Sequence, residues 1–386
     1  MKPIATFMMG WCCYLGRGTR RDEIKANQWL IESRTPDFEL GEYSVRLTTL
    51  IASSKPAAVR LFELCQFGSQ HDWLCKHLVA RFMVGGFGTV DDRQAAACLF
   101  QELADQGHAM SQCLLAKCYA EGYGVDRDDT KALEWFTKSA EKGNSCGQNA
   151  VGVGCSNGQG VTRDYDRAVE WYTKSANQGN VDAQNNLGVC YYKGNGVAQD
   201  FSKAFEWFTK AANQGYAGAQ FNLGVCYENG QGVDQDNAKA VEWYTKAAGQ
   251  GNANAQFGLG VCYYKGNGVA QDYTKAAEWY NKAANQGNCN GQFNLGRCYS
   301  YGSGVAQDDA LAVEWITKSA SQGHSASQEW LDIRNQYANS ITGRINKFIE
   351  TKHDFEFRFW MIPSVILLIA ILWNMSQPSK SALEIS

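Results

Sequence analysis

The chain has 386 residues, with 36 Lys or Arg and 39 Asp or Glu, so its formal charge is −3 and its pI is near 6.0. This balance lacks the basic excess that nucleic-acid-binding proteins need, and we expect no nucleic acid partner. The 39 glycines and only 5 prolines favour many short helices joined by tight turns.

Residues 1–106 carry weakened copies of one short pattern. The first copy, 1–34, has a Gly-x-Gly loop followed by an aspartate and a tryptophan. A shortened copy in 41–70 keeps only the apolar residues of one helix, Ala58, Leu61, Phe62 and Cys65. In 71–106 the glycine loop returns, and Leu99 stands where other copies have tryptophan. We therefore expect two or three degenerate helical hairpins that cap the N-terminal end of a repeat array.

Residues 107–322 repeat with a strict period of 36 residues. A glycine marks the start of each copy and the residue after the last one, at Gly107, Gly143, Gly179, Gly215, Gly251, Gly287 and Gly323. A tryptophan keeps the same step, at Trp135, Trp171, Trp207, Trp243, Trp279 and Trp315. A period of this size is typical of a solenoid in which stacked supersecondary units share a core.

The copy at 215–250 shows the two helices of one unit. Its first helix, which we name helix A, has apolar residues on one face: Ala219, Leu223, Cys226 and Tyr227. Gly224 lies beside that face and permits close approach. We expect the loop Gly230-Gln231-Gly232 to end helix A through a left-handed turn.

The second helix of the unit, helix B, begins after Asp236, whose carboxylate can cap the first turn. Its apolar stripe is Ala240, Trp243, Tyr244, Ala247 and Ala248. We expect the tryptophan to lie in the core. A Glu–Lys pair at i, i+4 recurs on helix B and predicts exposed ion pairs, at 134/138, 170/174, 206/210, 242/246, 278/282 and 314/318.

The repeated residues resemble the Sel-one-like repeat (SLR) family, an α-solenoid subclass of the tetratricopeptide-like superfamily. In 215–250 the residues that match the family pattern are Ala219, Gln220, Leu223, Gly224, Tyr227, Gly230, Gly232, Val233, Asp236, Lys239, Ala240, Trp243, Lys246 and Ala247. The resemblance implies an all-α fold, a right-handed α-α superhelix of about eight to nine hairpins. It also implies an adaptor or scaffold for proteins, as in signalling or quality control, with no catalytic residue and no cofactor.

The 14 cysteines could form a disulfide framework, but their placement favours free thiols. Six of them occupy one equivalent position, Cys12, Cys118, Cys190, Cys226, Cys262 and Cys298. Stacked helices lie about 8–10 Å apart, which exceeds the limit of about 7 Å between Cα atoms of a disulfide. We interpret these cysteines as small buried residues of a reducing compartment.

The histidines give only weak evidence for a metal site or a catalytic site. His71, Cys75 and His77 lie at a spacing that could hold zinc, which leaves a metal-dependent enzyme as a distant alternative, but a second ligand pair is missing. We expect no metal and no enzymatic activity. His108 and His324 follow the inter-repeat glycine, where other copies have asparagine, and are interpreted as capping or turn residues.

Helix A carries a second set of positions whose residue types differ between copies. In α-solenoids helix A lines a concave surface that binds partners, so these positions are our candidate surface for a protein or peptide. The alternative is that they are unconstrained solvent positions. We name the set the helix A stripe: Lys117, Asp182, Asn186, Val189, Lys193, Asn222, Val225, Val261, Asn294, Arg297 and Tyr301.

After the repeats, 323–352 is predicted to be a capping helix, with apolar residues near helical spacing at Trp330, Leu331, Ile333, Tyr337, Ile341, Ile345 and Phe348. The next segment, 359–375, has no charged residue and would be roughly 25 Å long as a helix. It is short for a hydrocarbon core of about 30 Å, but feasible. A short polar tail, 376–386, follows.

We expect 359–375 to be a single-pass tail anchor in a lipid bilayer. Basic residues are more frequent before it than after it, which predicts that the repeats face the cytosol. The alternative is an apolar helix that closes the solenoid or packs between the subunits of a homo-oligomer.

Overall fold

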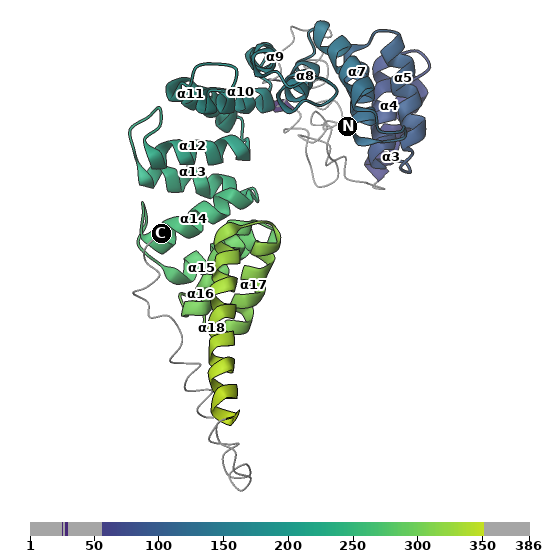
Figure 1. The fold of residues 1–386 in the computed structure, drawn as a ribbon. Helices are drawn as coiled ribbons and strands as arrows, with labels where there is room; N and C mark the ends of the chain where they lie inside the picture. Colours follow the sequence, from purple (N-terminus) through teal and green to yellow (C-terminus); the bar gives the residue numbers. More distant parts are fainter. Residues whose placement is uncertain (1–24, 26–27, 30–55, 351–386) are drawn as a thin grey trace. The chain divides into compact units, whose positions relative to one another are not determined.

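The computed structural model describes residues 25, 28–29 and 56–350, which form 16 helices, α3 to α18, without a β-strand among them (Figure 1). Every helix up to α17 has 13 residues, whereas α18 has 26. The bounds are α3 Pro56–Gly68, α4 Trp73–Gly85, α5 Arg93–Asp105, α6 Ala109–Glu121, α7 Asp129–Glu141, α8 Ser145–Asn157, α9 Tyr165–Asn177, α10 Val181–Lys193, α11 Phe201–Asn213, α12 Ala217–Asn229, α13 Asn237–Gly249, α14 Ala253–Lys265, α15 Tyr273–Asn285, α16 Cys289–Tyr301, α17 Asp309–Ser321 and α18 Ser325–Glu350. The expected all-α solenoid is therefore confirmed.

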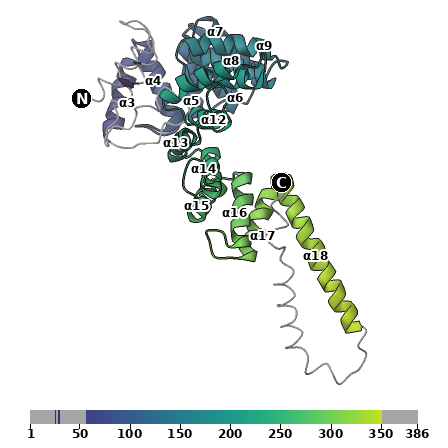
Figure 2. The same ribbon diagram turned by 90° about the vertical axis from the view of Figure 1, so that its left-hand side faces the viewer.

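The helices divide between two compact units, Met1–Gln250 with α3 to α13 and Gly251–Ser386 with α14 to α18. Within each unit a helix A packs on the helix B that follows it, and helix B packs on the next helix A (Figure 2). The hairpins are α4/α5, α6/α7, α8/α9, α10/α11, α12/α13, α14/α15 and α16/α17. This alternation is the stacking that the 36-residue period predicts.

The local signals of the sequence act as predicted. Gly230 ends α12 in the left-handed region at φ 66°, and its N–H donates to the carbonyl of Cys226. The Asp236 side chain accepts a hydrogen bond of 3.0 Å from the backbone N–H of Lys239 and so caps α13. The same aspartate cap begins every helix B from α5 to α17.

The second loop glycine, Gly232, joins neighbouring repeats. It also has a positive φ, 75°, and a β-carbon added there would overlap the backbone carbonyl of Phe201 in the preceding helix B. The loop therefore lies directly on the first turn of α11, and only glycine permits that approach. Its counterparts Gly88, Gly124, Gly160, Gly196 and Gly304 also lie close to the preceding backbone.

The core of each hairpin forms between helix A and an aromatic or aliphatic residue of helix B. Ala219, Leu223 and Cys226 are buried as predicted, and Tyr244 is only 1 % exposed. The Tyr244 ring lies against Gly224, where a β-carbon would collide with it. Gly224 thus accommodates a side chain of its own hairpin.

The tryptophan column differs from our prediction. The six tryptophans are half-buried at the seam between hairpins, and the lysine three residues later covers each ring at 3.8–4.2 Å from its centroid. This is a cation–π contact. In the five hairpins from α8/α9 to α16/α17, the tyrosine, phenylalanine or isoleucine that follows takes the buried place, since that position faces the helix A glycine.

The predicted Glu–Lys ion pairs are also mostly wrong. Among the described residues only Glu314 and Lys318 form one, at 2.7 Å. In the other copies the lysine lies over the tryptophan ring. The helix B caps supply ion pairs in their place, since Asp236 and Lys239 are 3.5 Å apart and three other copies repeat the arrangement.

Within each unit, a row of glutamines joins neighbouring hairpins, and we name it the glutamine ladder. A glutamine on helix A donates to an alanine carbonyl at the end of the preceding helix B, as Gln148 does to Ala140 at 3.3 Å. Its carbonyl oxygen accepts from the glutamine that ends its own hairpin. These pairs, at 2.6–2.8 Å, are Gln178–Gln148, Gln214–Gln184, Gln250–Gln220, Gln286–Gln256 and Gln322–Gln292.

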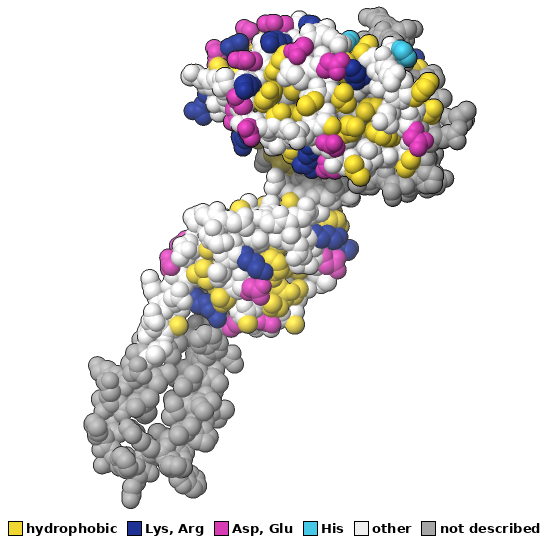
Figure 3. Space-filling view, turned by 90° about the vertical axis from the view of Figure 1, so that its right-hand side faces the viewer, with side chains coloured by type: hydrophobic (Ala, Val, Ile, Leu, Met, Phe, Trp, Pro, Cys, Tyr) yellow, Lys and Arg dark blue, Asp and Glu magenta, His cyan; other side chains and the backbone are white. Residues whose placement is uncertain are grey.

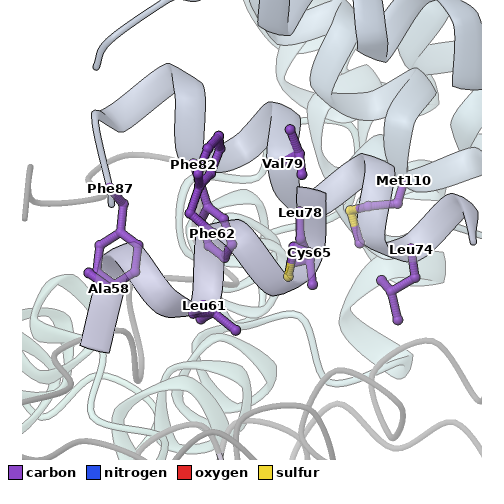
Figure 4. Packing of buried hydrophobic residues seen from close by; sticks show 10 residues of the cluster. All are labelled: Ala58, Leu61, Phe62, Cys65, Leu74, Leu78, Val79, Phe82, Phe87 and Met110. Atoms are coloured by element: carbon purple, nitrogen blue, oxygen red, sulfur yellow. The ribbon is translucent and has the colours of Figure 1, made fainter. Parts of the chain in front are cut away.

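The degenerate copies before residue 107 form helices where they are described. Ala58, Leu61, Phe62 and Cys65 on α3 are buried against α4, as their spacing predicts (Figure 4). Most of the predicted hairpin of 1–34 lies outside the described residues, but its Trp29 is half-buried against this same cluster. No disulfide joins any of the described cysteines.

The buried thiols of the equivalent position are inert. Burial raises the pKa of Cys226 to about 12 and that of Cys190 to about 11. At neutral pH such thiols stay protonated, whereas the thiolate is the nucleophile and the metal ligand. They serve as small core residues.

The predicted capping helix is α18, and it extends well past α17 (Figures 1 and 2). Among the residues of its predicted apolar stripe whose side chains are described, Trp330 and Leu331 are half-buried, while Ile333 is 41 % and Tyr337 is 55 % exposed. The predicted anchor 359–375 and the tail 376–386 lie outside the described residues. None of the helices that the structure describes is long and apolar enough to cross a bilayer.

Candidate protein-interaction surface

The structure places all eleven residues of the helix A stripe on A helices, namely α6, α10, α12, α14 and α16. Ten of them are half-buried and Lys193 is exposed. They do not stand freely in solvent, because they lie at the seam between consecutive hairpins. Val189 and Val261, for example, pack against the core clusters of their units. The stripe residues thus contribute to the stacking of hairpins, and part of each side chain remains accessible to solvent.

In the unit Met1–Gln250, the stripe is lined by amides that bond across repeats. Asn186 donates to Asn149 at 3.1 Å, and Asn222 donates to Asn185 at 2.9 Å. Each amide has two N–H donors and a carbonyl acceptor, so these bonds use part of its capacity. The remainder suits the backbone of a bound peptide.

Sequence reasoning missed Asn149 and Asn185. They lie one residue before the stripe position of their helices, at Ala150 and Asn186, and the helical projection did not include them. Their separation of 36 residues was the available signal. Of the other stripe residues of this unit, Lys117 lies on α6, and the rest lie on α10 and α12: Asp182, Val189, Lys193 and Val225.

Lys117, on α6, is a stripe residue whose pKa is shifted by its surroundings. Burial lowers the pKa of its ammonium group, while Cys113 and Glu121 oppose this shift and Arg81 adds to it. Arg81 on α4 is itself only 4 % exposed. The N-terminal part of the stripe therefore brings two cations close together.

In the unit Gly251–Ser386, the stripe is aromatic and cationic. The Arg297 guanidinium lies 5.8 Å from the centroid of the Phe293 ring. Burial raises the pKa of Tyr301, the charge of Arg297 opposes that shift, and Tyr264 of the neighbouring α14 adds to it. Val261, Arg297 and Tyr301 thus belong to one surface, to which Tyr264 and Phe293 add residues that the sequence did not single out. Asn294 bonds within its own helix, to the carbonyl of Asn290.

Charges on the face shown in Figure 3 are mixed, with Lys and Arg interspersed among Asp and Glu. No broad area of one sign is visible on that face.

The histidines and cysteines of the distant enzymatic alternative do not converge. His71 is exposed, Cys75 is half-buried, and His77 is buried with its Nδ1 2.9 Å from the hydroxyl of Ser111. Within the part of the chain that the structure describes, no group of three candidate ligands could hold a metal ion.

The two inter-repeat histidines hold N-cap positions. His324 accepts from the backbone N–H of Ser327 at 3.2 Å. His108 occupies the cap of α6 without a side-chain cap bond, and its ring stacks on Trp73 at a centroid distance of 4.4 Å. Both positions agree with the predicted turn role.

Comparison with known proteins identifies the repeat. The Sel1 repeat family model matches residues 3–33, 109–144, 147–180, 181–216, 217–252, 253–288 and 290–324, which together exceed half of the chain. A search of curated proteins gave no significant match.

Two solved structures are similar. A Sel1 repeat protein from Oxalobacter formigenes is 26 % identical with a TM-score of 0.59, over 63 % of this chain and 96 % of that one. The protective antigen c5321 of uropathogenic Escherichia coli, which displays an SLR fold, is 30 % identical over 84 % of this chain and 70 % of that one, with a TM-score of 0.49. A solenoid of this kind is suited to protein–protein interaction, and by the extent of the family match the chain belongs to the Sel1 repeat family.

Proposed function

We propose that the chain is an adaptor that binds protein or peptide partners on the helix A stripe. The observation that carries this is a contrast within each helix A. The core positions repeat the same residues, as Leu187, Leu223, Leu259 and Leu295 do. The half-buried stripe position is valine in the four middle copies, but it is Lys117 in the first copy and Arg297 in the last. Packing constrains the first set in every copy, whereas the stripe position also presents surface, where its lysine and arginine can select a partner.

We further propose that 359–375 tethers this adaptor to a membrane with the repeats in the cytosol. The support is the uncharged composition of the segment and the basic residues that precede it. A tether concentrates the repeats at a bilayer, where an adaptor in signalling or protein quality control would act.

Site-specific photo-cross-linking tests the adaptor function. A photoreactive residue replaces Asn222, on the helix A stripe, or Glu242, on the exposed face of helix B, in the full chain. We expect one discrete cross-linked partner from position 222 and none from 242. Equal yields at both positions, or none at either, would contradict the proposal.

Membrane fractionation tests the tether. The full chain should pellet with membranes, and a chain lacking 359–375 should be in the supernatant with its helical circular dichroism intact. Pelleting of the shortened chain after high-salt and carbonate washes would refute the anchor.

A second candidate function, self-assembly, is favoured by one observation, the exposed Ile333 and Tyr337 on α18. Large exposed apolar side chains on one helix face can join copies of a chain. Mass measurement in detergent distinguishes the candidates, since an adaptor that acts alone gives the protomer mass and a self-assembling solenoid gives a multiple of it.

A further inference from the structure

Arg297 is a half-buried cation on α16. No ion pair joins it to any acidic side chain among the described residues. Its guanidinium lies beside Phe293, with Tyr301 one helical turn further along α16. A half-buried guanidinium has lost part of its hydration, and a counter-ion that forms hydrogen bonds with it stabilises it strongly. This position is therefore prepared for a carboxylate from outside the chain.

The neighbouring helices supply apolar side chains at the equivalent positions. Counting 36 residues back from Arg297 leads to Val261 on α14, which is half-buried, and 36 forward leads to Ile333 on α18. Tyr301 has its equivalent in Tyr337, also on α18. Since Ile333 and Tyr337 are 41 % and 55 % exposed, α18 continues the stripe with an uncovered apolar face.

These three A-type helices are neighbours within one unit. Asn288, the cap of α16, donates to Asn254 of α14 at 2.8 Å. His324, in the turn before α18, lies 5.0 Å from the Phe293 ring between centroids. The surface along Val261, Arg297 and Ile333 is therefore apolar, then cationic, then apolar.

We propose that this surface binds an extended segment of a partner protein in which an Asp or Glu side chain lies between two aliphatic residues. The inference rests on the proposed adaptor function and names its partner chemistry. The acid pairs with Arg297, and the aliphatic residues pack on Val261 and on Ile333 with Tyr337.

The spacing of the segment follows from the spacing of the helices. Adjacent packed helices lie about 10 Å apart, and an extended chain advances about 3.3 Å per residue. A peptide that crosses the helices therefore meets a new one about every three residues. The expected motif is aliphatic-x-x-acid-x-x-aliphatic.

Fluorescence anisotropy with the full chain in detergent micelles tests this motif. The probe is a fluorescein-labelled peptide, Ser-Leu-Ser-Ser-Glu-Ser-Ser-Leu-Ser with an amidated C-terminus. Replacing its Glu by Gln should weaken binding about tenfold, since a charged hydrogen bond becomes a neutral one. Arg297→Gln should weaken binding of the Glu peptide to the same extent.

Charge exchange makes the test independent of a folding defect. Arg297→Glu should lose the Glu peptide and gain the matched Lys peptide, which a misfolded chain cannot do. Arg163→Glu, which changes an exposed arginine in the loop between α8 and α9 and outside the stripe, is the control and should leave both affinities unchanged.

Equal binding of the Glu, Gln and Lys peptides, or an equal effect of Arg163→Glu, would overturn the inference. So would a peptide without Glu that binds through a free C-terminal carboxylate more tightly than the Glu peptide. Neither result touches the adaptor function, which fails if cross-linking yields are equal at positions 222 and 242 or absent at both.

Discussion

The glutamine ladder is broken at one step, and this break predicts a stabilising substitution. Gln112 is 4 % exposed and donates to the carbonyl of Ala104, but its own carbonyl oxygen is buried without a donor from the described residues. The glutamine that would supply the donor is replaced by Lys142, whose ammonium group bonds to the carbonyl of Gly107 at 2.6 Å. Lys142→Gln should complete the ladder.

The expected gain is about 1 kcal/mol in the free energy of unfolding. A buried acceptor without a donor costs about 1–3 kcal/mol, and a new neutral hydrogen bond contributes about 1 kcal/mol net. The substitution also removes the exposed hydrogen bond from Lys142 to the carbonyl of Gly107, which offsets part of the gain. Gln214 shows that glutamine keeps such a bond as well, since it donates to Gly179 at 3.3 Å and to Gln184 at 2.8 Å.

Urea unfolding followed by circular dichroism measures the global effect, and hydrogen exchange of peptides from α6 and α7 localises it. The reciprocal variant Gln178→Lys should leave the Gln148 carbonyl without a donor and cost about 1–2 kcal/mol. If Lys142→Gln is neutral and Gln178→Lys is equally harmless, the ladder does not stabilise the stack.

Three further predictions concern packing, the loop and pH. Tyr244→Ala should cost about 3–5 kcal/mol and Trp243→Ala about 2 kcal/mol in urea unfolding, because the tyrosine is the buried ring; the opposite order would refute this core assignment. Gly232→Ala should lower the melting temperature more than Gly251→Ala, since both have positive φ but only the first meets backbone; equal losses would mean that the close approach is unimportant. Burial, with Arg81 and a second histidine nearby, holds the pKa of His77 well below its ordinary 6.5. The unfolded chain therefore binds the proton more readily, so stability should be full above pH 6.5 and fall by up to about 1.4 kcal/mol per unit below it. Urea titrations of wild type and His77→Gln from pH 7.5 to 5 check this, and parallel curves would contradict it.

Most of the fold could be predicted because its determinants are local and repeated. The left-handed Gly230, the Asp236 cap and the buried Cys226 each follow from residue type and helical spacing alone. Six near-identical copies also average out the local departures that obscure a single helix.

Features that depend on stacking could not be predicted in this way. Trp243 and Tyr244 both belong to one apolar stripe, and only the contact with Gly224 decides which ring is buried. Gln220 and Gln250 are polar and 30 residues apart. Residue type and helical spacing therefore do not indicate that their side chains form a hydrogen bond. Lys246 lies nearer to an aromatic face than to an acid, which charge spacing does not reveal.

The candidate surface depends on the same limits. Helical projection placed its residues on helix A, but the amide pairs across repeats and the uncovered face of α18 depend on how hairpins stack. The role of the stripe in binding stays a prediction, because only a bound partner can show which of these residues make contact.

A structure of the full chain with its cross-linked partner tests the central claim most directly. We expect the partner to contact residues of the helix A stripe and to make no contact with the lysine-covered tryptophans of helix B. A partner held only by helix B or by the inter-repeat loops would contradict the proposal that this solenoid binds through helix A.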